Sequence, residues 1–331
     1  MTLEGSVSAR ARRLIQDAVV WDNHGCMPLR ADAGHLPQLE RYRAAGVTVV
    51  SLNVGYGLRS WDEHLEVLTF MRGWIGARPQ AYRLISTAGD VSAAKASGQL
   101  GVVFDVEGMR PVQDDPGRVA RLYELGVRWM LVAYNRNNAA GGGCLDDDQG
   151  LTEVGRAIID TMDQVGMVLC LSHSGSRTAA EALAHTRNPA IFSHSNPKGD
   201  TPHPRNVSDD LMRACAAKGG VVGLSGIGPF LGADTGLAEA LLRQLDYVIG
   251  LVGPEHVGLG LDYVFDRAEL EADVATTPAL HSPGVDGGLA MTPPEAMGAI
   301  AEGLCRQDYS DLQVRGVLGE NWLRIARQVW R

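Results

Sequence analysis

Val102-Val-Phe-Asp-Val-Glu107-Gly108 is an apolar run of strand length that ends in a carboxylate and a glycine. Four more apolar runs end in a similar way, with a histidine or an aspartate near the last position. These ends are His24 in Val19-Val-Trp-Asp-Asn-His24-Gly-Cys26, His173 in Leu169-Cys-Leu-Ser-His173, His194 in Ile191-Phe-Ser-His194, and Asp262 in Val257-Gly-Leu-Gly-Leu-Asp262. Side chains delivered from the C-terminal ends of successive strands build the hydrolytic metal sites of β/α barrels. The five runs therefore predict a barrel with a metal site at its mouth.

Apolar segments and segments with helical spacing alternate along the chain. Strands are expected near residues 17–24, 47–54, 100–107, 127–134, 167–173, 190–194, 220–226 and 256–262. Helices are expected near 36–45, 62–74, 116–125, 152–165, 177–186, 208–218 and 236–251, followed by a C-terminal pair near 293–306 and 309–330. Eight strand–helix repeats are the number that closes a parallel barrel. We therefore predict an α/β fold, a (β/α)8 TIM barrel of the metallo-dependent hydrolase type, in one domain over residues 1–331 with the helices of 293–330 packed on it.

Two stretches do not fit regular elements and are expected to be loops. They are residues 135–150 after the fourth strand and residues 265–291 after the eighth. Both follow strands, so they lie on the face where barrel enzymes bind substrate. The acidic run 146–148 in the first loop lacks the spacing of an EF-hand, which favours a solvated loop over a calcium site.

Composition argues against several classes of protein. The chain of 331 residues has a formal net charge of −9 and no cluster of Lys and Arg, which argues against nucleic-acid and anionic membrane surfaces. It contains no run of 18 apolar residues, and its N-terminal residues lack an apolar stretch of signal-peptide length. Its five cysteines are scattered and odd in number, which argues against a disulfide framework. A cytoplasmic protein is the expectation.

The histidines at strand ends are the strongest candidates for metal ligands. A single such histidine is usually a hydrogen-bonded structural residue, but one barrel mouth would bring three of them together with Glu107. Neutral imidazole and carboxylate are suitable ligands for zinc-like divalent ions. The histidines in helices or before a strand are expected to face solvent, and the two in top-face loops are left open. The first set is His35, His64, His185 and His256, and the second is His203 and His281.

Asp262 and Arg205 are candidates for chemistry beside such a metal site. An aspartate after a strand often caps the next helix, but at this strand end a general base or proton shuttle is the better interpretation of Asp262. Arg205 follows the sixth strand in a loop, where it could form a bidentate pair with a substrate carboxylate.

Four motifs together resemble the membrane dipeptidase (renal dipeptidase) family of the metal-dependent amidohydrolase superfamily. They are Leu-Ser-His-Ser at 171–174, Phe-Ser-His-Ser at 192–195, His-Pro-Arg-Asn-Val-Ser-Asp-Asp at 203–210 and Leu-Gly-Glu-Asn-Trp-Leu-Arg at 318–324. The resemblance runs through nearly the whole chain and keeps the order of the motifs. It implies a binuclear zinc hydrolase that cleaves dipeptides, commonly tolerates a D-residue on the C-terminal side, and forms a homodimer.

The resemblance also implies roles for single residues. His24 would bind the first metal, Glu107 would bridge both metals, and His173 with His194 would hold the second. Arg205 and its neighbour Asn206 would bind substrate, the arginine through the terminal carboxylate. Asp262 would be the acid/base group.

Two positions depart from the family pattern. The first motif of the family is His-x-Asp, but this chain has His24-Gly25-Cys26. A thiolate can bind zinc with a bond longer by roughly 0.2–0.3 Å, so Cys26 could complete an altered site, leave it weak, or be a buried thiol without metal contact. In the fourth strand the family has a histidine near the scissile carbonyl, where this chain has Tyr134. Its hydroxyl could donate to the oxyanion or simply line the pocket.

The sequence therefore predicts a zinc-dependent, dipeptidase-like amidohydrolase with one or two Zn²⁺ per chain. Its substrate would be a small molecule, a dipeptide or an N-acyl amino acid, whose amide bond is cleaved by a metal-activated water. Two alternatives stay open. One is action on a non-peptide small carboxylate through other C–N cleavage, lactone hydrolysis or decarboxylation, and the other is a non-catalytic metal or metabolite binder.

Overall fold

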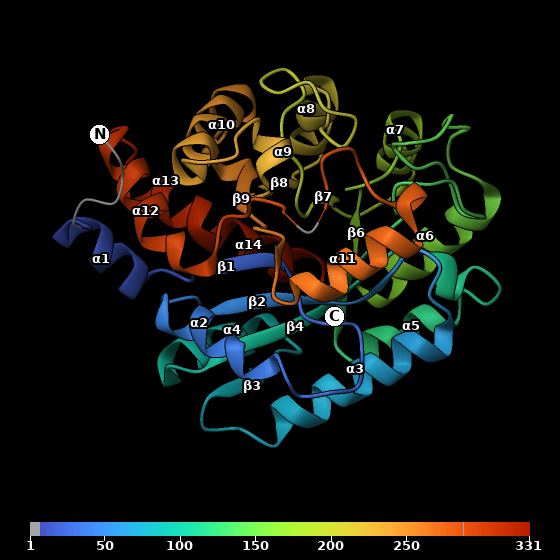
Figure 1. Ribbon diagram of the computed structural model, residues 1–331, viewed down its shortest axis with the longest axis horizontal. Helices are drawn as coiled ribbons and strands as arrows, with labels where there is room; N and C mark the ends of the chain where they lie inside the picture. The colour runs from blue at the N-terminus through green and yellow to red at the C-terminus, as the bar shows by residue number, and fades with distance from the viewer. Residues whose placement is uncertain (1–6, 287) are drawn as a thin grey trace.

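Eight parallel strands close into a barrel in the computed structural model, which describes residues 7–286 and 288–331 (Figure 1). The strands are paired in chain order, and the last pairs with the first through Asp22 and Leu259. They are β1 (Trp21–Cys26), β2 (Val49–Tyr56), β4 (Leu100–Glu107), β5 (Val127–Leu131), β6 (Val168–Cys170), β7 (Ile191–Phe192), β8 (Val221–Leu224) and β9 (Val257–Leu259). The predicted (β/α)8 TIM barrel is confirmed.

Two short strands extend this sheet and were not predicted. β3 (Tyr82–Leu84) pairs with the first residues of β4, and β10 (Tyr263–Val264) pairs with the end of β1. With three and two residues, they are too short to show an apolar pattern of their own. β10 matters for the site because it holds the chain directly after Asp262 against β1.

Helices surround the barrel, and every segment predicted to be helical contains one (Figure 1). Those are α2 (Glu40–Ala44), α3 (Trp61–Gly76), α5 (Arg118–Glu124), α6 (Glu153–Val165), α7 (Ser176–His185), α8 (Asp209–Ala217), α10 (Leu237–Val252), α12 (Met297–Arg306), α13 (Asp311–Arg315) and α14 (Asn321–Val329). Four further helices were not predicted: α1 (Ala9–Asp17), α4 (Ala88–Ser97), α9 (Gly228–Leu231) and α11 (Arg267–Thr276). None of the helices in the described ranges is long and apolar enough to span a bilayer.

The end of the chain closes the barrel at the side opposite the strand ends that carry the site. Trp322 Nε1 donates to Leu259 O at 3.1 Å, and its ring lies where side chains on Gly223 and Gly258 would collide with it. Asn321 Nδ2 donates to Val257 O at 2.8 Å. The late motif at 318–324 therefore has a structural use, because it holds α14 against β8 and β9.

The segment after the eighth strand is more ordered than expected. Residues 265–286 and 288–291, called the cap below, contain α11 and a 3-10 turn at Pro278–Leu280. No residue of α11 is buried, so its sequence has no apolar stripe from which a helix could be predicted. The cap lies across the barrel mouth, where Asn135 Nδ2 donates to Leu280 O at 2.7 Å and the Tyr56 hydroxyl donates to Asp273.

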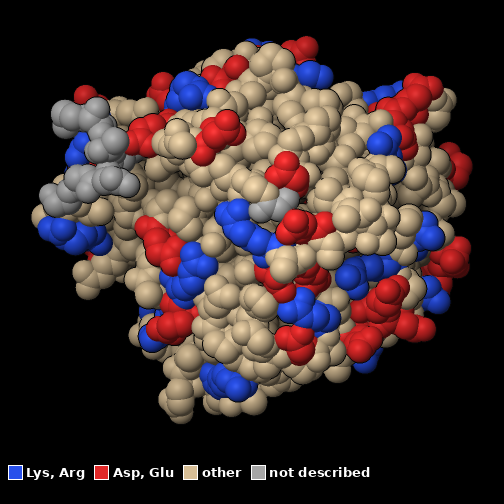
Figure 2. All heavy atoms as spheres, in the orientation of Figure 1, with Lys and Arg blue, Asp and Glu red and all other residues tan. Residues whose placement is uncertain are grey.

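Charge is distributed evenly over one face of the molecule. Figure 2 shows acidic and basic side chains interspersed over the described part of that face, with no extended basic patch on it.

Candidate active site

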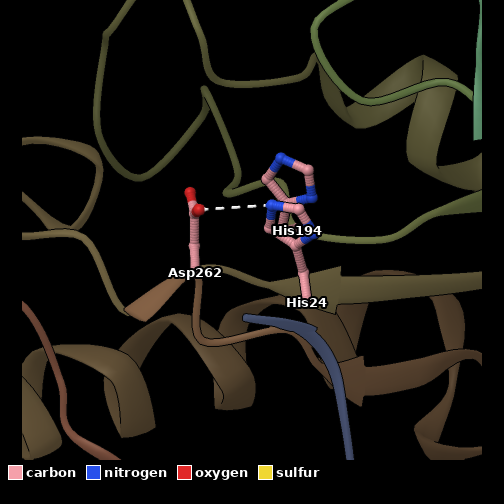
Figure 3. A group of neighbouring side chains, drawn as sticks. All are labelled: His24, His194 and Asp262. Atoms are coloured by element: carbon pink, nitrogen blue, oxygen red, sulfur yellow. Dashed lines mark ion pairs between the residues drawn. The ribbon is translucent and has the colours of Figure 1, made fainter. Parts of the chain in front are cut away.

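The strand-end residues predicted from the sequence meet at the barrel mouth. His24 lies within β1 and Glu107 ends β4, whereas His173, His194 and Asp262 follow β6, β7 and β9 by two or three residues. Figure 3 shows His24 stacked on His194, with Asp262 facing the His24 ring. The ring centroids of the two histidines are 4.1 Å apart, and His24 Nε2 lies 3.4 Å from Asp262 Oδ1.

Left-handed backbone occurs at three residues in the segments that lead from the strands into the mouth. Asn135, His173 and Asp262 have φ values of 57°, 63° and 62°, which non-glycine residues seldom adopt. Among the described residues other than glycine, only Asp308 shares this conformation, in a turn remote from the mouth. Strained backbone of this kind clusters at functional sites, where it sets the direction of side chains.

Glu107 stands at the centre of three imidazoles. Its Oε1 lies 3.2 Å from His194 Nε2, 3.3 Å from His173 Nε2 and 3.7 Å from His24 Nε2. This oxygen is buried and has no hydrogen-bond partner in the described chain. Burial raises the pKa of Glu107 to about 8, whereas burial holds the pKa of both His173 and His194 well below the usual value.

The tautomer of His173 leaves a lone pair facing the same point. Its Nδ1 lies 2.7 Å from Asn135 Oδ1, and the orientation of that amide is fixed because Asn135 Nδ2 donates to Leu280 O. His173 Nδ1 therefore carries the proton, and Nε2 lies 2.8 Å from His194 Nε2. Two close imidazole nitrogens beside a buried carboxylate oxygen without a donor form the ligand set of a divalent cation. The residues present fit such an ion.

The donor atoms fall into two groups that could each hold a metal. One contains Glu107, His173 and His194, and the other contains His24, His194 and Asp262. Cys26 adjoins the second group, since its Sγ lies 3.5 Å from His24 Nε2 and 3.5 Å from Asp262 Oδ1. Burial raises the pKa of the Cys26 thiol to about 12 and also raises the pKa of Asp262.

Asp105 supports His24 from behind and was missed by the sequence reasoning. Its fully buried carboxylate lies 3.3 Å from His24 Nδ1 and accepts hydrogen bonds from Ser51 Oγ at 2.6 Å and Asn53 Nδ2 at 3.1 Å. Burial lowers the pKa of His24, but the charges of Asp105, Cys26 and Glu107 and the hydrogen bond to Asp105 together outweigh it, and the net shift is upward. The sequence held a signal, because Asp105 stands two residues before Glu107 on the same face of a strand.

A cavity of about 100 Å³ opens beside these groups and runs under the cap. Cys26, Glu107, His173 and Asp262 line its polar end. The remaining wall is largely apolar, and we call its side chains the apolar chamber. They are Met27, Leu29, Ile227, Phe230, Val264 and Leu289.

Tyr134 lines the cavity in an aromatic stack. Its ring lies between His173, at a centroid distance of 4.3 Å, and Tyr56, at 4.8 Å. Burial raises the pKa of Tyr134 well above its usual value, so the phenol stays protonated and can donate.

Tyr56 and His281 complete this wall, and neither was predicted from the sequence to be a site residue. His281 Nε2 lies 3.0 Å from Asp273, which places this histidine in the cap above the site.

Arg205 lies behind His194 rather than in the wall of the cavity. Its guanidinium is almost fully buried and donates to His194 O at 2.9 Å and to Ser195 Oγ at 3.2 Å, which leaves Nε without a partner. Asn206 uses its amide nitrogen on the backbone carbonyls of Thr201 and Phe230 at 2.8 and 3.0 Å. These bonds occupy the amide nitrogen and hold the loop in place. Only the unpaired Oδ1 of the Asn206 side chain could therefore contact a substrate.

The remaining histidines correct one expectation. His64, expected to face solvent, is buried in α3, where Nδ1 bonds to Ser60 O at 2.7 Å and the ring packs against Gly55. Gly55 has no side chain, so the ring can approach the backbone closely. His35, His185 and His256 are partly exposed.

Comparison with known proteins gives consistent matches. The family described as membrane dipeptidase (Peptidase family M19) matches residues 9–282. The dipeptidase verJ of Clonostachys rogersoniana is 31% identical over 253 residues, which are 74% of this chain and 60% of that protein. An uncharacterized dipeptidase of Schizosaccharomyces pombe is 33% identical over 74% of this chain and 57% of its own length. This chain thus covers somewhat more than half of either relative.

A solved structure extends the likeness to almost the whole chain. The amidohydrolase from Pseudomonas aeruginosa has a TM-score of 0.87 and 26% sequence identity, and the match covers 97% of this chain and 99% of that one.

Proposed function

Because this chain belongs to the membrane dipeptidase family, we propose that it is a metal-dependent hydrolase of an amide bond in a dipeptide or an N-acyl amino acid. The observation that carries the proposal is the buried, unpartnered Oε1 of Glu107, which lies within 3.7 Å of three imidazole nitrogens. Without a cation at this point, burial would keep Glu107 largely protonated near neutral pH, because its pKa is raised to about 8. A divalent cation would instead stabilise the ionised carboxylate and accept the lone pairs of the neighbouring imidazoles.

His24, Glu107, His173 and His194 are the residues that would hold the metal, with Zn²⁺ as the ion their nitrogen and oxygen atoms suit best. When bound, such ions polarise a carbonyl and lower the pKa of water to about 7. Asn135 and Asp105 orient His173 and His24 through their Nδ1 atoms and keep both Nε2 atoms aimed at the ion.

Asp262 is the group proposed to move the proton. Its side chain is 16% exposed and lines the cavity, so it can reach both the attacking water and the leaving amine. Its raised pKa favours accepting a proton and returning it near neutral pH. Tyr134 presents a protonated hydroxyl to the cavity, where it can donate to the oxygen of the tetrahedral intermediate. Two N–H groups of Arg205 bond to Ser195 Oγ and His194 O, and the Nε–H has no partner. A substrate carboxylate would have to reach behind His194 to meet it.

The cavity wall supports an apolar side chain on the substrate. Asp266 and Glu269 also line the cavity, but both are paired with Arg30. Neither carboxylate is therefore unpaired beside the apolar chamber, and Arg30 is neutralised by the same ion pairs. A leucine-like side chain would gain about 1–3 kcal/mol there over a charged or very small one.

The experiment is a hydrolysis screen of metal-loaded protein on L,L and L,D dipeptides and N-acyl amino acids, with leucyl and aspartyl members matched in every series. We expect turnover of the apolar members. Asp262→Asn should lose turnover but retain metal at the position of Glu107, His173 and His194, which does not involve Asp262. The matched control is Asp308→Asn, since Asp308 has the same left-handed backbone outside the site. No turnover of any member by loaded protein would refute the proposal, and turnover of non-peptide carboxylates alone would replace it.

A further inference from the structure

We propose that Cys26 is a metal ligand, so that the metal position at β1 is a histidine–thiolate–carboxylate site that selects thiophilic ions such as Zn²⁺ over Mn²⁺ or Mg²⁺. The inference rests on the proposed function only in requiring that the site binds a metal. It deepens that function by giving the two metal positions different chemical character.

The first observation is the geometry of three donor atoms. His24 Nε2, Cys26 Sγ and Asp262 Oδ1 form a triangle with sides of 3.5, 3.5 and 3.4 Å. Zinc bonds of 2.0–2.1 Å to nitrogen, 2.3 Å to sulfur and 2.0–2.2 Å to a carboxylate oxygen put neighbouring ligands of a tetrahedral ion roughly 3.4–3.6 Å apart. The triangle therefore has the size of one face of a tetrahedral zinc site.

The second observation is that the described contacts of the Cys26 thiol give it no structural role apart from the site. Within residues 7–286 and 288–331, the only hydrogen-bond partners of Cys26 Sγ are His24 and Asp262, and Cys26 lines the cavity. The buried thiols differ: Cys170 Sγ lies 3.0 Å from Ser193 Oγ, and Cys215 Sγ donates to Ala190 O at 3.3 Å. Those two belong to the hydrophobic core, whereas Cys26 does not.

The two metal positions then differ in softness. The position around His173, His194 and Glu107 offers nitrogen and oxygen only, which suits zinc and also manganese. The position at Cys26 adds sulfur, which strongly favours zinc, cobalt or cadmium over the hard ions. Binding there replaces the S–H bond by a sulfur–metal bond, and the thiol proton is released to solvent.

Cobalt reports the ligand directly, because a thiolate bound to Co²⁺ gives a ligand-to-metal charge-transfer band in the near ultraviolet that nitrogen and oxygen ligands do not give. We would titrate metal-free protein with Co²⁺ and record absorption spectra of the wild type, Cys26→Asp and Cys26→Ala. The wild type should show the band, and Cys26→Asp should bind cobalt without it. Cobalt binding by the wild type without the band would overturn the inference and leave the proposed function standing. No cobalt or zinc binding at all would overturn both.

A second measurement needs no variant and guards against misfolding of the altered proteins. Alkylation by iodoacetamide in alkaline buffer, where part of the Cys26 thiol ionises despite its raised pKa, followed by peptide mass spectrometry, should modify Cys26 in metal-free protein and be suppressed by Zn²⁺. The internal control is Cys305, which is also partly exposed but lies on α12, away from the site. Equal modification of Cys26 with and without bound zinc would refute the assignment.

Discussion

Replacement of Asp105 by asparagine tests whether the second layer of the site works as its geometry indicates. The carboxylate is fully buried, lies 3.3 Å from His24 Nδ1 and is held by Ser51 and Asn53. Asparagine keeps the shape but removes the negative charge that holds the Nδ1 proton of His24. The imidazole then loses its fixed tautomer and part of the basicity of Nε2.

The expected size follows from this single contact. Loss of a carboxylate behind a metal-binding histidine lowers metal affinity by roughly 10- to 100-fold. That range corresponds to about 1.4–2.7 kcal/mol of binding free energy. The loss should concern one metal position, because Asp105 lies behind His24, whereas His173 is oriented by Asn135.

Competition with a zinc chelator measures this affinity in the wild type and in Asp105→Asn. The matched control is Asp163→Asn, which alters another buried carboxylate, one bonded to Thr186 and the Arg187 backbone away from the site. We expect the control to bind zinc as the wild type does. Unchanged affinity in Asp105→Asn would show that His24 is not a ligand or does not depend on Asp105, and would refute the reasoning.

Three further predictions concern stability and selectivity. Trp322→Phe removes the donor to the buried Leu259 carbonyl and should lower the free energy of unfolding by about 1–3 kcal/mol in denaturant titrations; no change would contradict the role of this residue in closing the barrel. The Glu302 carboxylate accepts from Ser8, which lowers its pKa from 4.5 to about 2, so its stabilisation is complete above pH 4.5 and is lost as the pH falls towards 2. Melting temperature measured against pH should fall less steeply in that range in Glu302→Gln than in the wild type, and parallel curves would refute this. Leu289→Ala should lower kcat/KM for leucyl substrates by about tenfold relative to glycyl ones, and an equal loss for both would exclude contact with the apolar chamber.

The barrel and most of its mouth could be predicted because short stretches of neighbouring residues determine them. Strands covered on both faces are continuous apolar runs, and each run ends where a polar side chain turns into the mouth. His24, Glu107, His173, His194 and Asp262 could therefore be placed together from chain order alone. The strand lengths could not, because strand pairing stops before the apolar runs do, and pairing depends on contacts between distant segments.

Residues that act through long-range contacts escaped the sequence reasoning. The role of Asn135 depends on a bond to Leu280, 145 positions away, and that of Asp105 depends on a histidine 81 positions earlier. α11 was missed for the opposite reason, since it buries no side chain and so shows no periodic apolar pattern. The prediction for His64 was wrong because a polar residue in a helix was expected to face solvent. Gly55 has no side chain, which leaves room for the His64 ring in the protein interior.

The proposed function requires a metal held by Glu107 and its three imidazoles, and metal content per folded chain tests this requirement most directly. Mass spectrometry of zinc-loaded, dialysed protein should find at least one zinc per wild-type chain. Glu107→Gln keeps the size of the side chain but removes its charge, and it should retain far less zinc while staying folded by circular dichroism. Equal zinc in both proteins, or none in the wild type, would contradict the account.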